Sequence, residues 1–272
     1  MKFSAKEKNR MKEKYGSWAV VTGASSGIGY ELALRLAEAG INLLINARNE
    51  LKLEEIRQDF QRRFAVQVLS VPGDVSSEDT INTIIESSKN LEVGLLIVSA
   101  GFGTSGEFIN NSIEAEKSML RVNCEALLIL THHFSKVFVQ HKRGGIILMS
   151  SMVAFQGVPH AANYAATKAY VQSLAEALAI ELKPLGVDIL AAAPGPVKSG
   201  FGQRADMKMG FSLTPEQIGA PILKALGRKT TVLPGTLTKF LVYSLMTVPR
   251  RVKVLIMNKV MGNMTRHQAQ ST

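Results

Sequence analysis

Apolar runs of strand length alternate along this chain with segments of helical periodicity, and this alternation most restricts the possible fold. The expected strands cover residues 18–22, 41–46, 66–71, 93–99, 146–150, 187–193 and 230–233. The expected helices cover residues 28–39, 50–63, 76–89, 113–140, 161–185 and 214–226. Continuous apolar strands joined by helices pair in parallel and are covered on both faces. The sequence therefore predicts an α/β fold, a doubly wound parallel sheet of about seven strands with helices on both faces.

Charge is unevenly placed along the 272 residues, whose formal net charge is +10. Residues 1–16 carry six Lys or Arg and two Glu, and residues 198–272 carry twelve Lys or Arg and two acids. The segment between them holds fourteen bases and eighteen acids. Basic ends of this kind suit an anionic surface. They lack interleaved aromatic residues and any nucleic-acid recognition motif, so nucleic acid is not an expected partner.

The composition and charge divide the chain into three expected parts. These are a basic N-terminal extension (1–16), a single catalytic domain (17–234) and an amphipathic, basic, helical C-terminal extension (235–272). The one cysteine, Cys124, excludes an internal disulfide and favours a reducing compartment. No secretory signal and no window of about 20 apolar residues is visible. We therefore expect a cytoplasmic protein, with the cytoplasmic face of a membrane as a second location to test.

Chemically informative residues follow the ends of the predicted strands. In chain order they are Gly23, Arg48, Asp74, Ser99–Gly101, Ser151 and Pro194-Gly195. In parallel α/β sheets, ligands bind beyond the carboxyl ends of the strands. The sequence therefore predicts one ligand cleft at this edge of the sheet.

A glycine-rich turn, Thr22–Gly29 (TGASSGIG), connects the first strand directly to the first helix. Glycines at such a turn allow the backbone to approach a phosphate closely, and the helix N-terminus favours negative charge. The spacing is GxxxGxG, which differs from the GxGxxG of the general dinucleotide fingerprint. The position between a buried strand and an amphipathic helix identifies the turn as a candidate phosphate-binding loop of a Rossmann-type fold.

The end of the second strand distinguishes between the two nicotinamide dinucleotides. An acid at this point holds the ribose hydroxyl of NAD, whereas an arginine suits the 2′-phosphate of NADP. The chain has Asn46-Ala47-Arg48-Asn49 here, with no acid, and Arg48 offers a planar set of donors to a phosphate. We therefore expect NADP(H) as the cofactor.

Tyr164 and Lys168 are four residues apart on a predicted helix, and Ser151 lies thirteen residues upstream of the tyrosine. A spacing of four places both side chains on one helix face, about 5–6 Å apart at Cβ. A free tyrosine has a pKa of about 10, and a nearby cation lowers it. The pair is suited to moving a proton on and off an alcohol oxygen.

Taken together, these motifs resemble the short-chain dehydrogenase/reductase family over residues 17–233. The resemblance implies a catalytic set of Asn123, Ser151, Tyr164 and Lys168. It implies cofactor contacts at Gly23, Ser25, Ser26, Gly27, Ile28, Gly29, Arg48, Asp74, Val75, Ala100, Gly101, Tyr164, Lys168, Pro194, Gly195, Val197 and Ser199. Two positions depart from the family pattern. Ser99 stands where the family usually has a structural asparagine, and Ser199 stands where it often has threonine.

The resemblance implies reversible reduction of a carbonyl group by NADPH. Ser151 is expected to stabilise the developing alkoxide, Tyr164 to donate the proton, and Lys168 to lower the pKa of Tyr164 and bind the nicotinamide ribose. Asn123 is expected to complete a water path for reprotonation. A non-catalytic NADPH-binding scaffold or sensor is the alternative, and it would bind the cofactor without turning over any ketone.

Apolar residues near the predicted cleft favour a hydrophobic ketone or aldehyde. The C-terminal segment resembles those of family members that reduce steroid or long acyl ketones, and this resemblance implies a steroid-like or long-chain acyl substrate. The candidate substrate contacts are Phe102, Met152, Phe155 and Phe201. Residues 235–262 form two amphipathic, basic pieces, for which contact with a membrane, packing on a subunit or over the pocket, and extension of the core all stay open. The family pattern implies a homodimer or tetramer. No histidine or cysteine pattern predicts a metal site.

Overall fold

The strands of the computed structural model, which describes residues 3–268, form one parallel sheet, as the sequence predicts. Its seven strands are β1 (Trp18–Thr22), β2 (Asn42–Ala47), β3 (Val68–Pro72), β4 (Val93–Val98), β5 (Gly144–Met149), β6 (Val187–Ala192) and β7 (Thr231–Val232). They lie in the order β3-β2-β1-β4-β5-β6-β7. The direction of winding reverses between β1 and β4, which is where an open α/β sheet binds its ligands.

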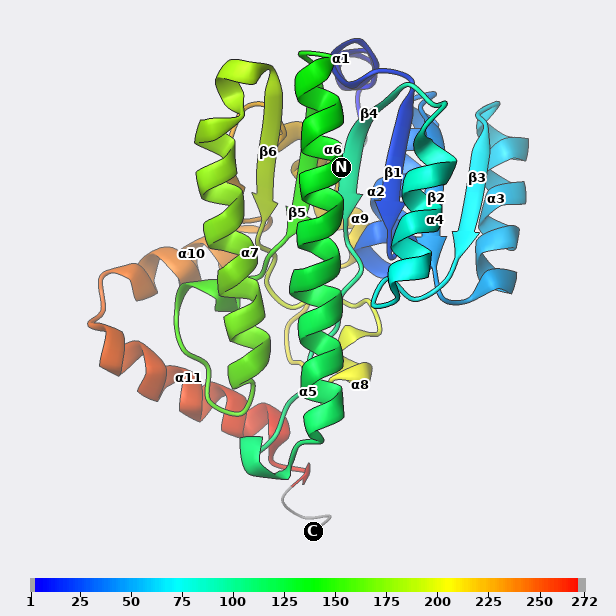
Figure 1. Ribbon diagram of the computed structural model, residues 1–272. Coiled ribbons are helices and arrows are strands. Elements are labelled where there is room, and N and C mark those ends of the chain that lie inside the picture. The colour runs from blue at the N-terminus through cyan, green and yellow to red at the C-terminus, as the bar shows by residue number, and fades with distance from the viewer. Residues whose placement is uncertain (1–2, 269–272) are drawn as a thin grey trace.

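Helices cover both faces of the sheet (Figure 1). On one face lie α4 (Glu78–Ser88), α5 (Ile113–Leu120), α6 (Leu127–Gln140) and α7 (Ala162–Glu181), and on the other α2 (Gly27–Glu38), α3 (Glu50–Phe64) and α9 (Pro215–Ala225). Two separate apolar clusters fill the layers between the sheet and these helices. The predicted fold class is therefore confirmed.

Several element boundaries differ from the sequence-based expectation. The helix expected at 113–140 contains a π-helical stretch, Arg121–Ala126, between α5 and α6. The helix expected at 161–185 ends at Glu181 and is followed by a short 3-10 turn, Lys183–Leu185. Hydrophobic periodicity predicts that a helix is present, but it does not show where the backbone hydrogen bonds change locally to a π-helical or 3-10 pattern.

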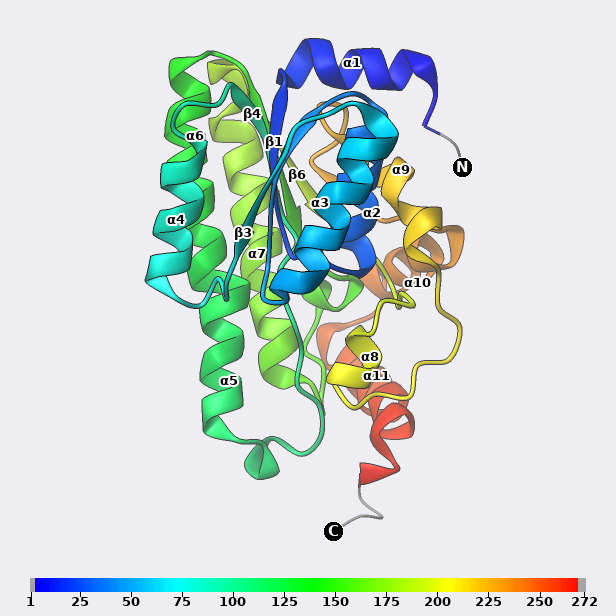
Figure 2. The same cartoon turned by 90° about the vertical axis from the view of Figure 1, so that its right-hand side faces the viewer.

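The N-terminal segment forms helix α1 (Ala5–Tyr15), which lies across the amino ends of the strands (Figure 2). Met11 and Tyr15 are fully buried in the main core. The hydroxyl of Tyr15 donates a hydrogen bond to Asp188 at 2.8 Å, and Lys14 forms an ion pair with the same carboxylate at 2.6 Å. The basic segment therefore packs on the domain, and the proposed boundary at residue 16 stays a prediction.

The C-terminal segment forms two helices, α10 (Thr236–Met246) and α11 (Arg250–Thr265), joined by a turn at Pro249. Both lie beyond the carboxyl ends of the strands, at the opposite end of the molecule from α1 (Figures 1 and 2). The short helix α8 (Phe201–Arg204) lies at this end as well.

Candidate active site

A cavity of about 820 Å³ lies at the carboxyl edge of the sheet, where the sequence places its ligand cleft. All the residues predicted to contact the cofactor line it, as do Ser151, Phe102, Met152 and Phe201. Asn123 and Phe155 do not line it. Topology explains the convergence, because every strand of a parallel sheet ends at the same edge.

The glycine-rich turn at the end of β1 has the backbone geometry expected of a phosphate loop. Gly23 has a φ of +68°, and a Cβ atom there would lie 2.7 Å from the backbone nitrogen of Ala100. Gly27 has a φ of +58° and begins α2, whose N-cap residue Ser26 makes no side-chain capping hydrogen bond. The first N–H groups of α2 are therefore left for an anion. The turn thus fits the diphosphate of a dinucleotide.

Two arginines and one carboxylate also line the cavity. Arg48 and Asp74 are 3.8 Å apart; Arg48 is exposed and Asp74 is partly exposed. Arg204, from α8, lies with its guanidinium 4.1 Å above the ring of Phe102. Burial and the charge of Arg48 lower the pKa of Arg204, while Asp74 raises it. The three side chains therefore share one charged edge of the cavity, with a net positive charge.

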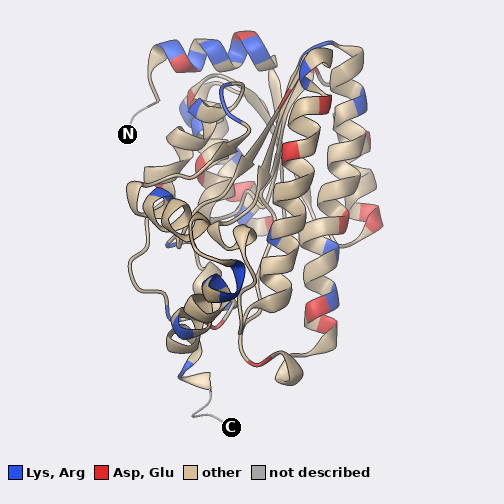
Figure 3. Cartoon of the chain, turned by 90° about the vertical axis from the view of Figure 1, so that its left-hand side faces the viewer, with Lys and Arg blue, Asp and Glu red and all other residues tan. Residues whose placement is uncertain are grey.

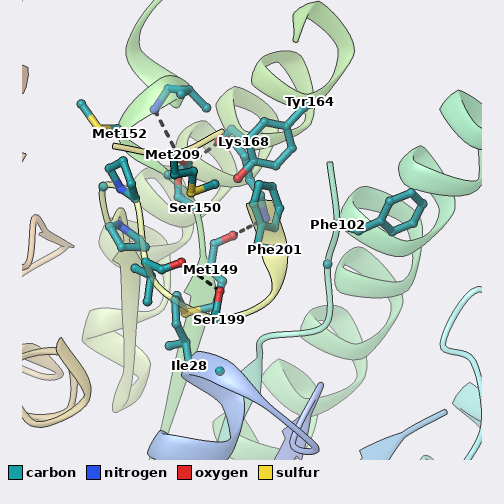
Figure 4. Close-up of a pocket in the computed structure, with 18 of the residues that line it drawn as sticks. Ile28, Phe102, Met149, Ser150, Met152, Tyr164, Lys168, Ser199, Phe201 and Met209 are labelled. Carbon is teal, nitrogen blue, oxygen red and sulfur yellow. Dashed lines mark hydrogen bonds between the residues drawn. The ribbon is translucent and has the colours of Figure 1, made fainter. Parts of the chain in front are cut away.

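Tyr164, Lys168 and Ser151 line the same cavity, and all three side chains are buried. Figure 4 shows Tyr164 and Lys168. Helix α7 carries the tyrosine and the lysine on one face. The ammonium of Lys168 donates a hydrogen bond to the carbonyl of Met149 at 2.8 Å and lies 5.8 Å from the centre of the Tyr164 ring. The end of β5 thus fixes the lysine beside the phenol.

The pKa values of this pair differ from the expectation. Burial raises the pKa of Tyr164 to about 12, and a hydrogen bond with Ser151 opposes the rise only in part. Burial lowers the pKa of Lys168 to about 8. Burial dominates both shifts, because the loss of water disfavours both charged forms and the Lys168 ammonium donates its hydrogen bond to the Met149 carbonyl and not to the phenol. At neutral pH the phenol is therefore a protonated donor.

Asn123 lies in the π-helical stretch, and its side chain braces the loop after β4. Its amide oxygen accepts a hydrogen bond from the N–H of Phe102 at 3.1 Å, and its amide nitrogen donates to the carbonyl of Phe102 at 2.9 Å. The same nitrogen donates to the hydroxyl of Thr167 at 3.0 Å. Both N–H donors of the side-chain amide are thus used, and the side chain links the β4 loop to the helix that carries Tyr164 and Lys168. Its expected part in a water path stays a prediction.

The four candidate substrate contacts are not equivalent. Phe201 lies against Tyr164, with ring centres 5.1 Å apart, and Met152 lines the cavity (Figure 4). Phe102 lies beneath Arg204, toward the charged edge. Phe155 instead packs against the small apolar cluster that contains Ala193. The prediction placed Phe155 in the pocket because it follows Ser151 closely, but the 3-10 turn Met152–Phe155 directs it away.

The C-terminal helices contribute a wall of the cavity, which is one of the positions that the sequence left open for residues 235–262. Their lining residues are Thr236, Leu237, Thr238, Leu241, Ser244 and Leu245 from α10, and Ile256, Met257, Val260, Met261 and Met264 from α11. The amphipathic periodicity of 235–262 was the available signal, but periodicity alone does not say which surface a helix covers.

Seven of the ten methionines within residues 3–268 line the cavity, namely Met149, Met152, Met207, Met209, Met257, Met261 and Met264. Methionine side chains are unbranched and polarisable, and they adapt to ligands of different shape. Much of the cavity wall is thus apolar and deformable.

Within residues 3–268, no group of three or more His, Cys, Asp or Glu side chains has the arrangement of a metal site. In the same part of the chain, no helix combines the length and the apolar character needed to cross a membrane.

Residues 17–209 match the family model of the short chain dehydrogenases, and the chain belongs to this family of nicotinamide-dependent oxidoreductases that act on alcohol and carbonyl groups. It is 27% identical to a 7beta-hydroxysteroid dehydrogenase of Mediterraneibacter gnavus, covering 84% of this chain and 90% of that one. It is 38% identical to a very-long-chain 3-oxoacyl-CoA reductase-like protein of Arabidopsis thaliana, over 67% of this chain and 60% of that protein.

Solved structures agree with this assignment. A structure of a 7beta-hydroxysteroid dehydrogenase superposes with a TM-score of 0.84 and 25% identity, covering 91% of this chain and 98% of that one. A short-chain dehydrogenase from Sphingobium yanoikuyae in complex with NADPH superposes with a TM-score of 0.76 and 25% identity, covering 86% of this chain and 96% of that one.

Proposed function

We propose that the protein is an NADPH-dependent reductase that transfers hydride to a hydrophobic ketone or aldehyde, and that it oxidises the corresponding alcohol in the reverse direction. The observation that carries this proposal is the buried group of Tyr164, Lys168 and Ser151. It lies in the same cavity as the phosphate loop and next to an apolar wall. A proton donor, a dinucleotide site and an apolar substrate site are thus contiguous.

A bound nicotinamide supplies the hydride. The chain's own residues bind the carbonyl oxygen of the substrate and donate a proton to it. Ser151 donates a hydrogen bond to the carbonyl oxygen and stabilises the negative charge that develops there. Tyr164, protonated at neutral pH, donates its proton to that oxygen. Lys168, which is mostly protonated below pH 8, favours the phenolate that remains.

The charged edge of the cavity supports NADPH over NADH. Arg48 follows β2, the strand whose end carries the residue for the ribose 2′-substituent in dinucleotide folds, and it has no bidentate carboxylate partner among the described residues. Arg204 adds a second guanidinium beside it. The NADPH complex of the Sphingobium yanoikuyae relative is consistent with this choice.

The apolar wall supports a bulky or elongated substrate. The cavity volume, about 820 Å³, lies in the upper range of ligand sites and is shared with the dinucleotide. The relatives named as hydroxysteroid dehydrogenase and very-long-chain 3-oxoacyl-CoA reductase-like protein are both named for hydrophobic substrates. A steroid-like or long-chain acyl ketone is therefore the proposed class.

The direct test is NADPH consumption by the purified protein with a panel of aldehydes, steroid ketones and 3-ketoacyl thioesters. We expect turnover of at least one hydrophobic ketone, loss of turnover in Tyr164→Phe, and unchanged NADPH binding in that variant. Phe108→Ala is a matched control, because Phe108 is exposed and outside the cavity. Full turnover by Tyr164→Phe would remove the tyrosine from the mechanism.

The second candidate is an NADPH-binding scaffold or sensor without turnover. Burial of Tyr164 and Lys168 at an apolar cavity argues against it, because such burial is costly without a chemical role. Binding of NADPH without reduction of any carbonyl in the panel would favour the scaffold.

We also propose that the protein acts in the cytoplasm as a homo-oligomer, a dimer or a tetramer. Exposed apolar residues on α5, α6 and α7, among them Leu120, Leu128 and Ile180, support association through these helices. Peripheral membrane contact through residues 235–262 is the further location proposed, and it is supported by the charge and exposure of α10 and α11.

A further inference from the structure

Helix α11 has apolar side chains on two sides, and only one side is used by the fold. On the inner side, Met257 and Met261 are buried and line the cavity. On the outer side, Val252 and Leu255 are exposed, and a shallow groove lies over them. A helix that covers a cavity needs only one apolar side. We therefore infer that the outer apolar side of α11 contacts another molecule.

Exposed apolar side chains are concentrated on α10 and α11. Nine of them are large and at least one-third exposed, namely Leu237, Phe240, Leu241, Tyr243, Met246, Val252, Leu255, Ile256 and Val260. Phe240 is 69% exposed and Leu255 is 60% exposed. We call these nine residues, with the cations of the two helices, the α10–α11 surface. An apolar patch of this density marks an interaction site.

The charge of the α10–α11 surface has a single sign. No Asp or Glu follows Glu216 in the sequence, whereas nine Lys and Arg do. Five of these lie on the two helices, namely Lys239, Arg250, Arg251, Lys253 and Lys259, and none forms an ion pair within residues 3–268. Figure 3 shows the basic residues of this end of the molecule. The surface is therefore complementary to an anionic partner.

The substrate cavity opens on this same surface. Leu241, Ile256 and Val260 are exposed and also line the cavity. They therefore form its rim between α10 and α11. A molecule bound across the two helices would lie directly over the apolar part of the active site.

The charge of the α10–α11 surface distinguishes between two occupants, a second copy of this chain and a lipid bilayer. A second copy docked through the same surface would bring two sets of five unpaired cations together, with no acid between them. A bilayer that contains anionic lipid offers both the negative charge for the cations and an apolar layer for side chains such as Phe240 and Leu255. The bilayer is therefore favoured.

The basic helix α1 does not belong to this surface. It lies at the other end of the strands, so one flat membrane meets either α1 or the α10–α11 surface. Its Arg10 and Lys14 form ion pairs with Glu7 and Asp188. The local charge of α1 is thus partly neutralised, whereas that of the α10–α11 surface is not.

We propose that α10 and α11 lie in the plane of an anionic bilayer and that the rim of Leu241, Ile256 and Val260 admits hydrophobic carbonyl substrates from that bilayer. The binding half specifies the membrane contact proposed above and does not depend on the reductase activity, while the substrate half rests on that activity. No helix of the described chain needs to span the membrane for this arrangement, because the contact is interfacial.

The binding half is tested by flotation of the full-length protein with two kinds of vesicle, pure phosphatidylcholine and phosphatidylcholine mixed with phosphatidylserine. We expect binding to the mixed vesicles and a loss of at least tenfold in Arg250→Glu/Arg251→Glu, because each cation near such a surface contributes about 1 kcal/mol. We expect a comparable loss in Phe240→Ser/Leu255→Ser. Lys6→Glu/Lys8→Glu on α1 is the matched control and should bind normally.

Equal binding by wild type and both α10–α11 variants would overturn the proposal, as would no binding to either vesicle. Size-exclusion chromatography runs in parallel. If Phe240→Ser/Leu255→Ser dissociates an oligomer without a change in flotation, the surface belongs to a second copy and the bilayer assignment is wrong. Thermal melting of each variant separates loss of binding from loss of folding.

The substrate half is tested by comparing two ketones found in the activity panel, one water-soluble and one partitioned into vesicles. Mixed vesicles should raise the reduction rate of the partitioned ketone severalfold in wild type but not in Arg250→Glu/Arg251→Glu, whose rate with the soluble ketone should be normal. A rate that is independent of vesicles would overturn substrate delivery. Failure to reduce either ketone would count against the proposed function, while flotation would still decide docking.

Discussion

The ring of Phe201 lies against the ring of Tyr164, with centres 5.1 Å apart and planes inclined by 46°. Phe201 is the first residue of α8, and the tyrosine lies on α7. Gly103 makes the approach possible, because a Cβ atom there would lie 2.7 Å from the Phe201 ring. The loop after β6 thus covers the proton donor with an aromatic side chain, which keeps water away from it and gives an apolar substrate a wall to pack on.

The first prediction concerns this contact. Phe201→Ala removes an aromatic pair that contributes about 0.5–1.5 kcal/mol beyond simple burial. We expect kcat/KM for a hydrophobic ketone to fall about three- to tenfold, with NADPH affinity unchanged. Steady-state kinetics measure the effect, and Phe108→Ala serves as the exposed control. An unaltered kcat/KM would show that Phe201 does not form part of the substrate wall.

The second prediction is a pH dependence that arises from Lys168. Burial lowers its pKa to about 8, so its positive charge is present below pH 8 and is lost as the pH rises through that value. Tyr164, whose pKa is raised to about 12, stays protonated throughout this range. The rate of ketone reduction should therefore fall above about pH 8. In Lys168→Arg, whose side chain does not deprotonate, any residual rate should lose this step. A profile that is flat to pH 10 in wild type would contradict the assignment.

The third prediction concerns the choice of cofactor. Arg48→Gln removes a charge-assisted hydrogen bond, which contributes about 1.5–3 kcal/mol. We expect the Kd for NADPH to rise about ten- to a hundredfold while that for NADH changes little. Arg204→Gln should also raise the Kd for NADPH, but by a smaller factor. Fluorescence titration of the reduced cofactors gives these constants. Arg62→Gln, on the exposed side of α3, is the control, and equal losses for NADPH and NADH in Arg48→Gln would disprove a 2′-phosphate contact.

The fourth prediction concerns the attachment of α1 to the domain. Burial raises the pKa of Asp188, but hydrogen bonds from Lys14, Lys183 and Tyr15 outweigh this and lower it. Because the folded pKa lies below the unfolded one, the contribution of Asp188 to stability is complete above its unfolded pKa of about 4 and is lost as the pH falls.

Asp188→Asn should therefore destabilise the protein at pH 7 by about 1.5–3 kcal/mol, since the buried carboxylate loses its charge-assisted hydrogen bonds with Tyr15, Lys14 and Lys183. The difference between variant and wild type should shrink below pH 4. Urea unfolding at several pH values measures both effects. The exposed pair of Lys117 and Glu114 offers a control in Glu114→Gln, for which a change within about 0.5 kcal/mol is expected.

The architecture and the chemical core of the site could be predicted from the sequence because both depend on short-range patterns. A buried strand is a run of apolar residues, a phosphate loop is a glycine-rich turn between a strand and a helix, and the spacing of Tyr164 and Lys168 places them on one helix face. Parallel topology then brings the strand ends together. These steps require no knowledge of contacts between distant segments.

The tertiary structure decided what surrounds those groups. Phe201 meets Tyr164 and α11 closes the cavity because segments separated by dozens of residues fold onto one another, and no local pattern records such contacts. Asn123 braces the Phe102 backbone, and Phe155, three residues beyond the lining residue Met152, is directed away from the pocket. The direction of the Tyr164 pKa shift likewise depends on burial and on where the Lys168 ammonium is held, which are properties of the assembled site and not of the spacing between the two residues.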